Sequence, residues 1–205
     1  MDKGYQIAMR YLGWLAAAAA LAAATVPAQA QNFSDAYEFI KAVKDRNGDK
    51  ATSLISQPGS IVINTRERGT LNGALHILAR ERDITWLAFL LGKGAKPDIQ
   101  NREGNTPLAI AAQIGWVDGA DRLLRSGASV DLSNNRGETP LILAVHNRDI
   151  AMVRLLLGKG ADPNRADSVA GYSALDYAKQ DRRSDAILKL LEEGGTRKKV
   201  TGPTL

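Results

Sequence analysis

The sequence predicts an all-α solenoid, in which helix-turn-helix units stack on one another and β-turns or short hairpins form their tips. Two recurring residue types support this fold class. A leucine recurs every 33 or 34 residues, at Leu75, Leu108, Leu141 and Leu175. A glycine recurs with the same spacings, at Gly94, Gly127, Gly160 and Gly194. A period shared by two residue types indicates a repeat architecture, in which each unit buries its apolar face against its neighbours.

The first thirty residues show the three-part pattern of a secretory signal peptide. A short start with Lys3 and Arg10 precedes an apolar run over residues 11–26, and Ala28-Gln29-Ala30 follows. The run is shorter than the roughly 20 residues that span a bilayer. We therefore expect residues 1–30 to be cleaved off, with an uncleaved membrane anchor as the alternative. The pattern predicts a periplasmic or secreted protein of a Gram-negative bacterium, without stable membrane anchoring after cleavage.

Residues 31–66 are expected to form a degenerate capping unit at the N-terminal end of the stack. Its first helix is expected over about residues 34–43 and its second over about 49–55, where Pro58-Gly59 interrupts the chain. Terminal units of a solenoid are commonly atypical, because one of their faces meets water.

Two later units begin with a clear helix-start signal. Thr106 and Thr139 are placed to cap a first helix, because a threonine hydroxyl accepts a hydrogen bond from an unpaired backbone N–H. Each is followed by a proline, Pro107 or Pro140, at the first helical position, where the missing N–H costs nothing. We expect short first helices that start at these prolines.

The second helix of each unit is expected to end at the recurring glycine. Helix C-termini commonly need a residue with a left-handed backbone, which glycine adopts without strain. Asp98, Asp131 and Asn164 each lie four residues beyond such a glycine. We expect these side chains to brace the following turn through hydrogen bonds to backbone groups.

These features resemble the ankyrin repeat, whose pattern is Gly-x-Thr-Pro-Leu-His, then Ala-Ala, Leu-Leu and Gly-Ala-Asp. The match is clearest over residues 104–112 and 137–144. The resemblance covers about residues 33–195. It implies four clear repeats over 67–195, at about 67–100, 101–133, 134–166 and 167–195. A basic flexible tail over 196–205 would follow them.

The chain departs from that pattern at several turns. Gly73-Ala74-Leu75-His76 replaces Thr-Pro-Leu-His, so we expect a weak helix cap there. Arginines occupy the family's inter-helix glycine position in three units, at Arg82, Arg148 and Arg182. Because arginine tolerates a left-handed backbone poorly, we expect those helix breaks to shift by a residue, for example onto Asn147.

Composition excludes several kinds of chemistry. The absence of cysteine removes disulfides, thiol catalysis and cysteine-ligated metals, and two histidines are too few for a histidine-rich metal site. We expect no cofactor and no bound metal. The net charge is +5 and the pI is about 9.5, which is too weakly basic to indicate nucleic acid as a partner.

The residues that could support catalysis are better explained by structure. His76 occupies the family's structural histidine position and is expected to hold the turn network. His146 has no serine, aspartate or glutamate placed to complete a triad, although it could contact a partner. Gly92-Lys93-Gly94 follows a helix rather than a strand, so it is interpreted as a helix end and not as a phosphate loop. We expect no enzymatic activity.

The resemblance implies a protein partner, bound at the concave face by turn tips and first-helix ends. The predicted partner-binding residues are Arg66, Arg68, Arg80, Arg102, Glu103, Asn105, Gln113, Arg136, Glu138, His146 and Asn147. Their mixture of arginine and glutamate favours a partner with acidic character over nucleic acid. We expect a monomer, and we expect Glu138→Ala to be almost silent in stability.

The predicted function is that of an exported interaction module, which acts as an adaptor, a stabiliser or an inhibitor. One alternative is a secreted effector that acts on a host or neighbouring cell. A second alternative is an unrecognised enzyme, which is disfavoured because an open solenoid offers no closed pocket where catalytic groups converge.

Overall fold

The computed structural model describes the backbone of residues 28–181 and 183–200, and the side chains of residues 34–181 and 183–194. Packing divides the chain into two units, Met1–Asp35 and Ala36–Leu205, and the four clear repeats predicted over 67–195 lie in the second. Most of the expected signal peptide (residues 1–27), Arg182 and residues 201–205 lie outside the described residues. Among the described helices, none is long and apolar enough to cross a bilayer.

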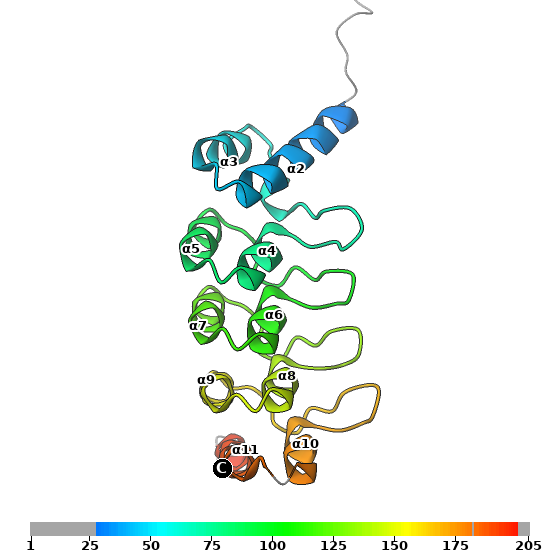
Figure 1. Ribbon diagram of the computed structural model, residues 1–205, viewed down its shortest axis with the longest axis vertical. Helices are drawn as coiled ribbons and strands as arrows, with labels where there is room; N and C mark the ends of the chain where they lie inside the picture. Colours follow the sequence, from blue (N-terminus) through cyan, green and yellow to red (C-terminus); the bar gives the residue numbers. More distant parts are fainter. Residues whose placement is uncertain (1–27, 182, 201–205) are drawn as a thin grey trace, which may run out of the picture. The chain divides into compact units, whose positions relative to one another are not determined.

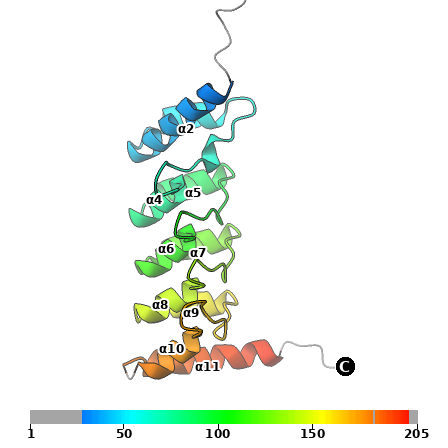
Figure 2. The same ribbon diagram turned by 90° about the vertical axis from the view of Figure 1, so that its right-hand side faces the viewer.

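The regular structure of the described residues is helical, as the sequence predicts. The elements are α2 (Ala28–Lys44), α3 (Gly48–Ile55), the 3-10 helix η1 (Val62–Asn64), α4 (Ala74–Arg80), α5 (Ile84–Gly92), α6 (Pro107–Gln113), α7 (Val117–Arg125), α8 (Pro140–His146), α9 (Ile150–Gly158), α10 (Ala174–Gln180) and α11 (Asp185–Val200). In the second unit, the first helices α4, α6, α8 and α10 form one column and the second helices α5, α7, α9 and α11 form another (Figure 1). A loop projects beside each of these first helices, and each helix pair makes one layer of the stack (Figure 2).

The recurring leucines lie between the layers. Leu108 and Leu141 are fully buried, and Leu75 is 4% exposed. Leu175 is only partly buried, because α10 lies in the last described layer and packs on one side alone. Burying one such side chain stabilises the fold by about 1.5–3 kcal/mol, so the leucine period records the contact between neighbouring repeats.

The predicted helix caps are confirmed. The Thr106 hydroxyl accepts a hydrogen bond from Ala109 N at 3.1 Å, and the Thr139 hydroxyl accepts one from Ile142 N at 3.3 Å. Pro107 and Pro140 are the first residues of α6 and α8. At α4 the cap residue is Gly73, which has no side chain to offer, as the departure from the Thr-Pro pattern predicts.

The glycine prediction holds for three of the four positions. Gly94, Gly127 and Gly160 follow α5, α7 and α9 with φ values of 88° or 89°. Gly194 does not end a helix, because α11 runs on to Val200, through the start of the segment expected to be a flexible tail. A Cβ at Gly194 would lie 2.9 Å from Leu157 Cδ2, so this glycine instead allows close packing of α11 on α9.

The expectation that arginines displace the inter-helix turns is wrong at Arg82 and Arg148, and its third position, Arg182, lies outside the described residues. Arg82 and Arg148 adopt the left-handed backbone themselves, with φ of 54° and 53°, and Arg46 does so at 57°. Each guanidinium bonds to the next repeat. Arg46 Nε donates to Asp83 at 2.6 Å, Arg148 Nε donates to Asp181 at 2.5 Å, and Arg82 donates to the Ile114 carbonyl. These bonds offset the strain that a left-handed residue carries.

Candidate protein-binding surface

The tips of the last three repeats are tight turns, each built around one side-chain oxygen. Asn101 Oδ1 accepts from the backbone N–H groups of Glu103 and Asn105, at 3.0 and 2.9 Å. Asn134 repeats the arrangement one repeat later with Arg136 and Glu138. In the last repeat the carboxylate of Asp167 takes this place and accepts from Val169, Ala170 and Gly171. Asparagine and aspartate fix turns in this way because their short side chains reach the backbone two residues ahead.

Backbone hydrogen bonds join each tip to the next. Arg102 N donates to the Thr70 carbonyl at 2.9 Å, and Asn135 N donates to the Glu103 carbonyl at 3.1 Å. Ser168 N donates to the Arg136 carbonyl at 3.0 Å. The tips therefore form a connected row, whose side chains are held at fixed positions relative to one another.

Aspartates brace a second set of turns between repeats. Asp98 accepts a hydrogen bond from Ser129 N at 2.9 Å, and Asp131 accepts one from Asp162 N at 3.0 Å. The predicted turn-bracing role is confirmed for these two residues, and the braced turn belongs to the following repeat. Among the described residues, no three histidine, aspartate or glutamate side chains are grouped as metal ligands.

Two predicted partner-binding residues, Asn105 and Glu138, are buried rather than exposed. Each is only 7% exposed. The Asn105 Oδ1 accepts from Asn134 Nδ2 at 3.0 Å, and Glu138 Oε2 accepts from the same amide at 2.9 Å. Both side chains therefore belong to the network beneath the tips. Only side chains from neighbouring repeats complete this network, so the sequence of one unit does not reveal it.

His76 belongs to the same network, as predicted. Its ring is fully buried, Nδ1 accepts from Gly73 N at 3.1 Å, and Nε2 lies 2.8 Å from the Asn105 carbonyl. These partners require the neutral ring with its proton on Nε2. Burial lowers the pKa of His76, and the charges of Arg80 and Arg66 lower it further. The histidine thus satisfies the backbone N–H of the N-cap residue Gly73, which is the reciprocal half of a capping box at α4, and it ties this repeat to the next.

The other predicted contact residues are exposed. They are Arg66, Arg68, Arg80, Arg102, Glu103, Gln113, Arg136, His146 and Asn147. Two of them also hold the stack together. Arg66 donates to the Gln100 carbonyl at 3.2 Å, and Asn147 Nδ2 donates to the Gln113 carbonyl at 2.6 Å. Arg80, Gln113 and His146 lie at or near the last residue of α4, α6 and α8, so these helix ends and the tips present side chains on successive repeats.

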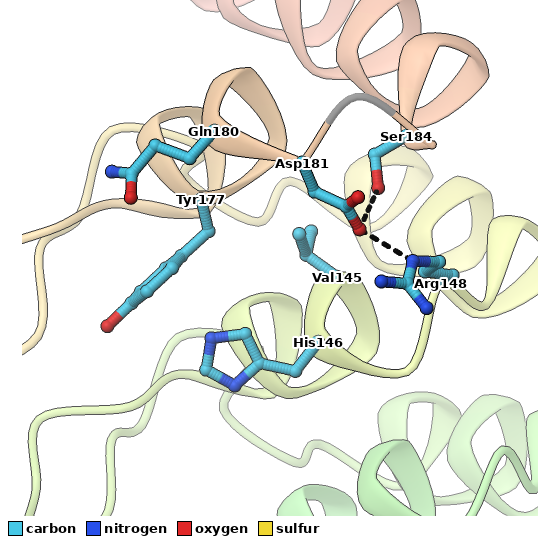
Figure 3. Close-up of a pocket in the computed structure, with 7 residues that line it drawn as sticks. All are labelled: Val145, His146, Arg148, Tyr177, Gln180, Asp181 and Ser184. Atoms are coloured by element: carbon cyan, nitrogen blue, oxygen red, sulfur yellow. Dashed lines mark hydrogen bonds and ion pairs between the residues drawn. The ribbon is translucent and has the colours of Figure 1, made fainter.

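A small pocket lies between the last two repeats, where α8 and α10 end. Its lining residues are Val145, His146, Arg148, Tyr177, Gln180, Asp181 and Ser184. Figure 3 shows the His146 and Tyr177 rings on one side of this pocket and the bonded Arg148 and Asp181 on the other. The two rings meet edge to face, with centroids 4.4 Å apart. The hydrogen bond that Tyr177 donates to Asp167 at 2.5 Å raises the pKa of Tyr177 to about 12.

Sequence reasoning missed the tyrosines at this end of the stack. Tyr172 and Tyr177 pack edge to face with centroids 5.6 Å apart, and Tyr172 is 42% exposed. A signal was present in the repeat alignment. Tyr177 occupies the position that Ile110 and Leu143 hold in earlier repeats, so a polar aromatic ring replaces an aliphatic side chain only in the last unit.

Comparisons with known proteins agree with this geometry. Residues 75–167 match the family described as "Ankyrin repeats (3 copies)". The chain is also similar to the E3 ubiquitin-protein ligase XB3 of Oryza sativa subsp. japonica, with 33% identity over 94 residues. That similarity covers 44% of this chain and spans only 20% of the length of the ligase. The chain therefore contains ankyrin repeats within residues 75–167, a segment that includes helices α5 to α9 and the tips at Asn101 and Asn134.

Proposed function

Because ankyrin repeats indicate a protein–protein interaction module, we propose that this protein is exported and binds a protein partner through its tips and first-helix ends. The observation that carries the proposal is the bonded row of tips. Thr70 accepts from Arg102 N, Glu103 accepts from Asn135 N, and further along Arg136 accepts from Ser168 N. Each link fixes one exposed tip against its neighbour.

The proposed mechanism is rigid presentation of a preformed surface. Ordering loops and side chains on binding costs about 0.5–1.5 kcal/mol for each flexible side chain that is immobilised. A row of tips that is already hydrogen-bonded avoids the backbone part of this cost. Such a surface suits an adaptor, a stabiliser or an inhibitor, and none of these roles requires a catalytic group. We therefore propose a binding role without enzymatic activity.

Export is proposed from the N-terminal pattern of residues 1–30. The charged start, the apolar run and Ala28-Gln29-Ala30 support secretion through the inner membrane of a Gram-negative bacterium. Cell fractionation followed by N-terminal sequencing tests this proposal. A periplasmic protein that starts at Gln31 is the expected result. A protein recovered mainly from the culture medium supports the effector alternative, and an intact N-terminus in the membrane fraction supports an uncleaved anchor.

Binding is tested by affinity capture from periplasmic extract with three baits. The first bait is the unchanged protein, and the second carries Arg66→Glu, Arg102→Glu and Arg136→Glu. The third is a matched control with Arg122→Glu and Arg154→Glu, because these exposed arginines lie on the second helices α7 and α9. Circular dichroism confirms that each bait is folded.

A protein that the first and third baits capture and the second loses supports recognition at the tips. Equal capture by the first two baits would indicate that the interface lies on another face of the stack. Loss in the third bait alone places the interface on the second helices. Capture from culture medium but not from periplasm favours the effector alternative.

A further inference from the structure

The pocket between α8 and α10 has a volume of about 360 Å³, and binding sites commonly measure about 300–1,000 Å³. Tyr177 in its wall packs edge to face on Tyr172, which is 42% exposed on the last tip. The pocket therefore adjoins the surface of tips and first-helix ends, and it has room for a side chain of a partner.

The junction that precedes this pocket is closed by an amide of the chain itself. Asn147 Nδ2 donates to the carbonyls of Gln113 at 2.6 Å and Ala112 at 3.3 Å, at the end of α6. Asp181 holds the matching position in the last repeat, and its carboxylate has no N–H to donate. It accepts from Arg148 instead. Within the described residues, no side-chain amide covers the end of α8 in this way, so a donor from outside the chain can take that place.

Hydrogen bonds hold the walls of the pocket. Tyr177 donates to Asp167 at 2.5 Å, which fixes its ring beside the last tip. On the opposite wall Arg148 Nε donates to Asp181 at 2.5 Å. Ser184 donates to the same carboxylate at 3.1 Å (Figure 3). A ligand would thus meet side chains that are already ordered, so binding would lose little conformational entropy.

The charges in the pocket are already paired. Apart from the titratable ring of His146, the charged residues that line it are Arg148 and Asp181, which are bonded to each other. An ionised ligand would give up its water for a site that offers no unpaired partner in return. A neutral polar group carries a smaller desolvation cost, so the pocket favours an uncharged ligand.

The pocket offers such a group both donors and acceptors. Within the described residues, the two η nitrogens of Arg148 and the side-chain amide of Gln180 make no hydrogen bond. The η nitrogens can only donate, whereas the end of α8 presents carbonyls, which can only accept. The polar group that suits both is one that donates and accepts at once, as a hydroxyl does.

Rings and an aliphatic side chain line the rest of the pocket. The His146 and Tyr177 rings have centroids 4.4 Å apart, and Figure 3 shows Val145 between these rings and the ion pair. An aromatic ring suits such walls, because rings favour edge-to-face contacts. Tyrosine joins an aromatic ring to a hydroxyl, whereas phenylalanine has no polar group and tryptophan can only donate. Tyrosine is also enriched among the residues that dominate the binding energy of protein interfaces.

We propose that the pocket binds a tyrosine side chain of a protein partner, with its ring against His146 and Tyr177 and its hydroxyl between Arg148 and the end of α8. This inference rests on the proposed function, because it names the anchor residue that the same surface takes. The anchor then lies at the last junction of the stack, and the tips of the earlier repeats contact the partner on one side of it.

The test is a selection of random dodecapeptides displayed on phage against the full chain. Enriched peptides are synthesised, together with copies in which phenylalanine or alanine replaces tyrosine. Fluorescence anisotropy measures the affinity of each peptide. Free p-cresol, which carries the tyrosine ring and hydroxyl without a peptide, is measured as a competitor.

Three variants of the chain show where the peptides bind. Tyr177→Leu installs the residue that Leu143 provides in the preceding repeat, and Tyr177→Phe keeps the ring. Arg148→Ala removes the proposed donor to the hydroxyl. Arg122→Glu with Arg154→Glu, on the second helices α7 and α9, is the control. Thermal melts establish that every variant is folded.

The enriched peptides should share a tyrosine. Its replacement by alanine should weaken binding about tenfold or more, and its replacement by phenylalanine about two- to tenfold, the range for one hydrogen bond. Tyr177→Leu should weaken binding several-fold, whereas Tyr177→Phe and the control should bind as the wild type does. In Arg148→Ala the difference between the tyrosine and phenylalanine peptides should shrink, because the hydroxyl has lost its donor.

Other outcomes overturn the inference. Enriched peptides without tyrosine would mean that the chain selects another side chain. Tyrosine peptides that bind Tyr177→Leu and Arg148→Ala as tightly as the wild type would lie outside the pocket. A selection without any enriched peptide would leave the pocket without a peptide anchor. Competition by p-cresol at the concentrations at which the peptides bind would replace the partner with a small aromatic ligand.

Capture from periplasmic extract separates this inference from the proposed function. A partner that the wild type captures and the Tyr177→Leu bait loses supports both. A partner that these two baits capture equally overturns the inference and leaves the proposed function standing. If no bait captures a protein, the proposed function fails, and the peptide measurements still decide what the pocket binds.

Discussion

Arg148 donates a hydrogen bond from Nε to Oδ2 of Asp181 at 2.5 Å, and this bond joins two successive repeats. Arg148 holds a left-handed backbone with φ of 53°, which costs an L-residue about 1–2 kcal/mol. Arg46 shows the same combination, with φ of 57° and a bond of 2.6 Å to Asp83 in the next repeat. In both places a strained arginine stands at a turn between helices and acts as a bridge along the stack.

Replacing Arg148 by alanine and by glycine separates the cost of the left-handed backbone from the loss of the hydrogen bond to Asp181. Arg148→Ala should be less stable than Arg148→Gly by about 1 kcal/mol, because both lose the bond to Asp181 and only glycine relieves the left-handed backbone. Urea denaturation of the two variants measures the difference. Arg154 in α9 is the matched control, since glycine in a helix is less stable than alanine there by about 0.5–1 kcal/mol. If the glycine variant were less stable than the alanine variant at Arg148 as well as at Arg154, the turn at Arg148 would carry no strain.

Asp181→Asn tests the acceptor of the hydrogen bond that Arg148 donates. The hydrogen bond from Arg148 lowers the pKa of Asp181 to about 2, below the value of about 3.9 in an unfolded chain. A lowered pKa contributes stability that is complete above about pH 4 and is lost as the pH falls through about 2. The Tm of the wild type should therefore exceed that of the variant at neutral pH, and the gap should close on acidification. A gap that is constant down to about pH 2 would assign the loss to packing rather than to the charge.

Leu141→Ala tests the stacking of the repeats. Leu141 is fully buried between layers, so the change should lower the free energy of unfolding by about 2–5 kcal/mol. Arg102→Ala on the neighbouring tip removes an exposed side chain and should change it by less than about 0.5 kcal/mol. Chemical denaturation of both variants gives the comparison. Similar losses in the two would mean that the leucine period does not mark the core.

Glu138→Ala should not be silent, in contrast to the expectation from sequence. Glu138 is 7% exposed and accepts from Asn134 Nδ2 at 2.9 Å. Removing a buried partner of this kind costs about 1–3 kcal/mol. Glu138→Gln keeps an acceptor in place and should cost less, and Glu103→Ala on the exposed tip should cost least. If thermal melts rank Glu103→Ala below Glu138→Ala in stability, the network beneath the tips is not what holds this turn.

The parts of the fold that could be predicted depend on signals within one repeat. Thr106 caps α6 through the N–H of Ala109, three positions later. Gly127 follows the end of α7 with a left-handed backbone. Both effects are local, so a single sequence carries them in full. The leucine period then gives the stacking, because identical units bury identical positions.

The parts that could not be predicted depend on contacts between repeats. Arg148 tolerates its backbone because of Asp181, which is 33 positions away, and Asn105 is buried because Asn134 bonds to it from the next repeat. Neither partner is visible in the pattern of one unit. The sequence also predicts that the arginines of the tips are surface residues, whereas the contact between the Tyr177 and His146 rings depends on the packing of α10 against α8.

The last prediction concerns the buried histidine. His76 must be neutral to accept from Gly73 N at Nδ1 while donating to the Asn105 carbonyl from Nε2. Burial lowers the pKa of His76 below the ordinary histidine value of about 6.5, so the unfolded chain binds a proton more readily than the folded one does. The stability that His76 contributes is therefore complete above the unfolded pKa of about 6.5, and it is lost as the pH falls below that value.

His76→Gln should be less stable than the wild type near pH 7.5, because glutamine cannot satisfy both backbone groups in the same geometry. Between about pH 7.5 and 5.5 the Tm of the wild type should fall more steeply than that of the variant, because only the wild type titrates at this position. The exposed His146 is unchanged in both proteins, so the difference between the two curves isolates His76. Parallel curves of Tm against pH would mean that protonation of His76 does not affect stability in this range. The neutral ring would then not be what links α4 to the following tip.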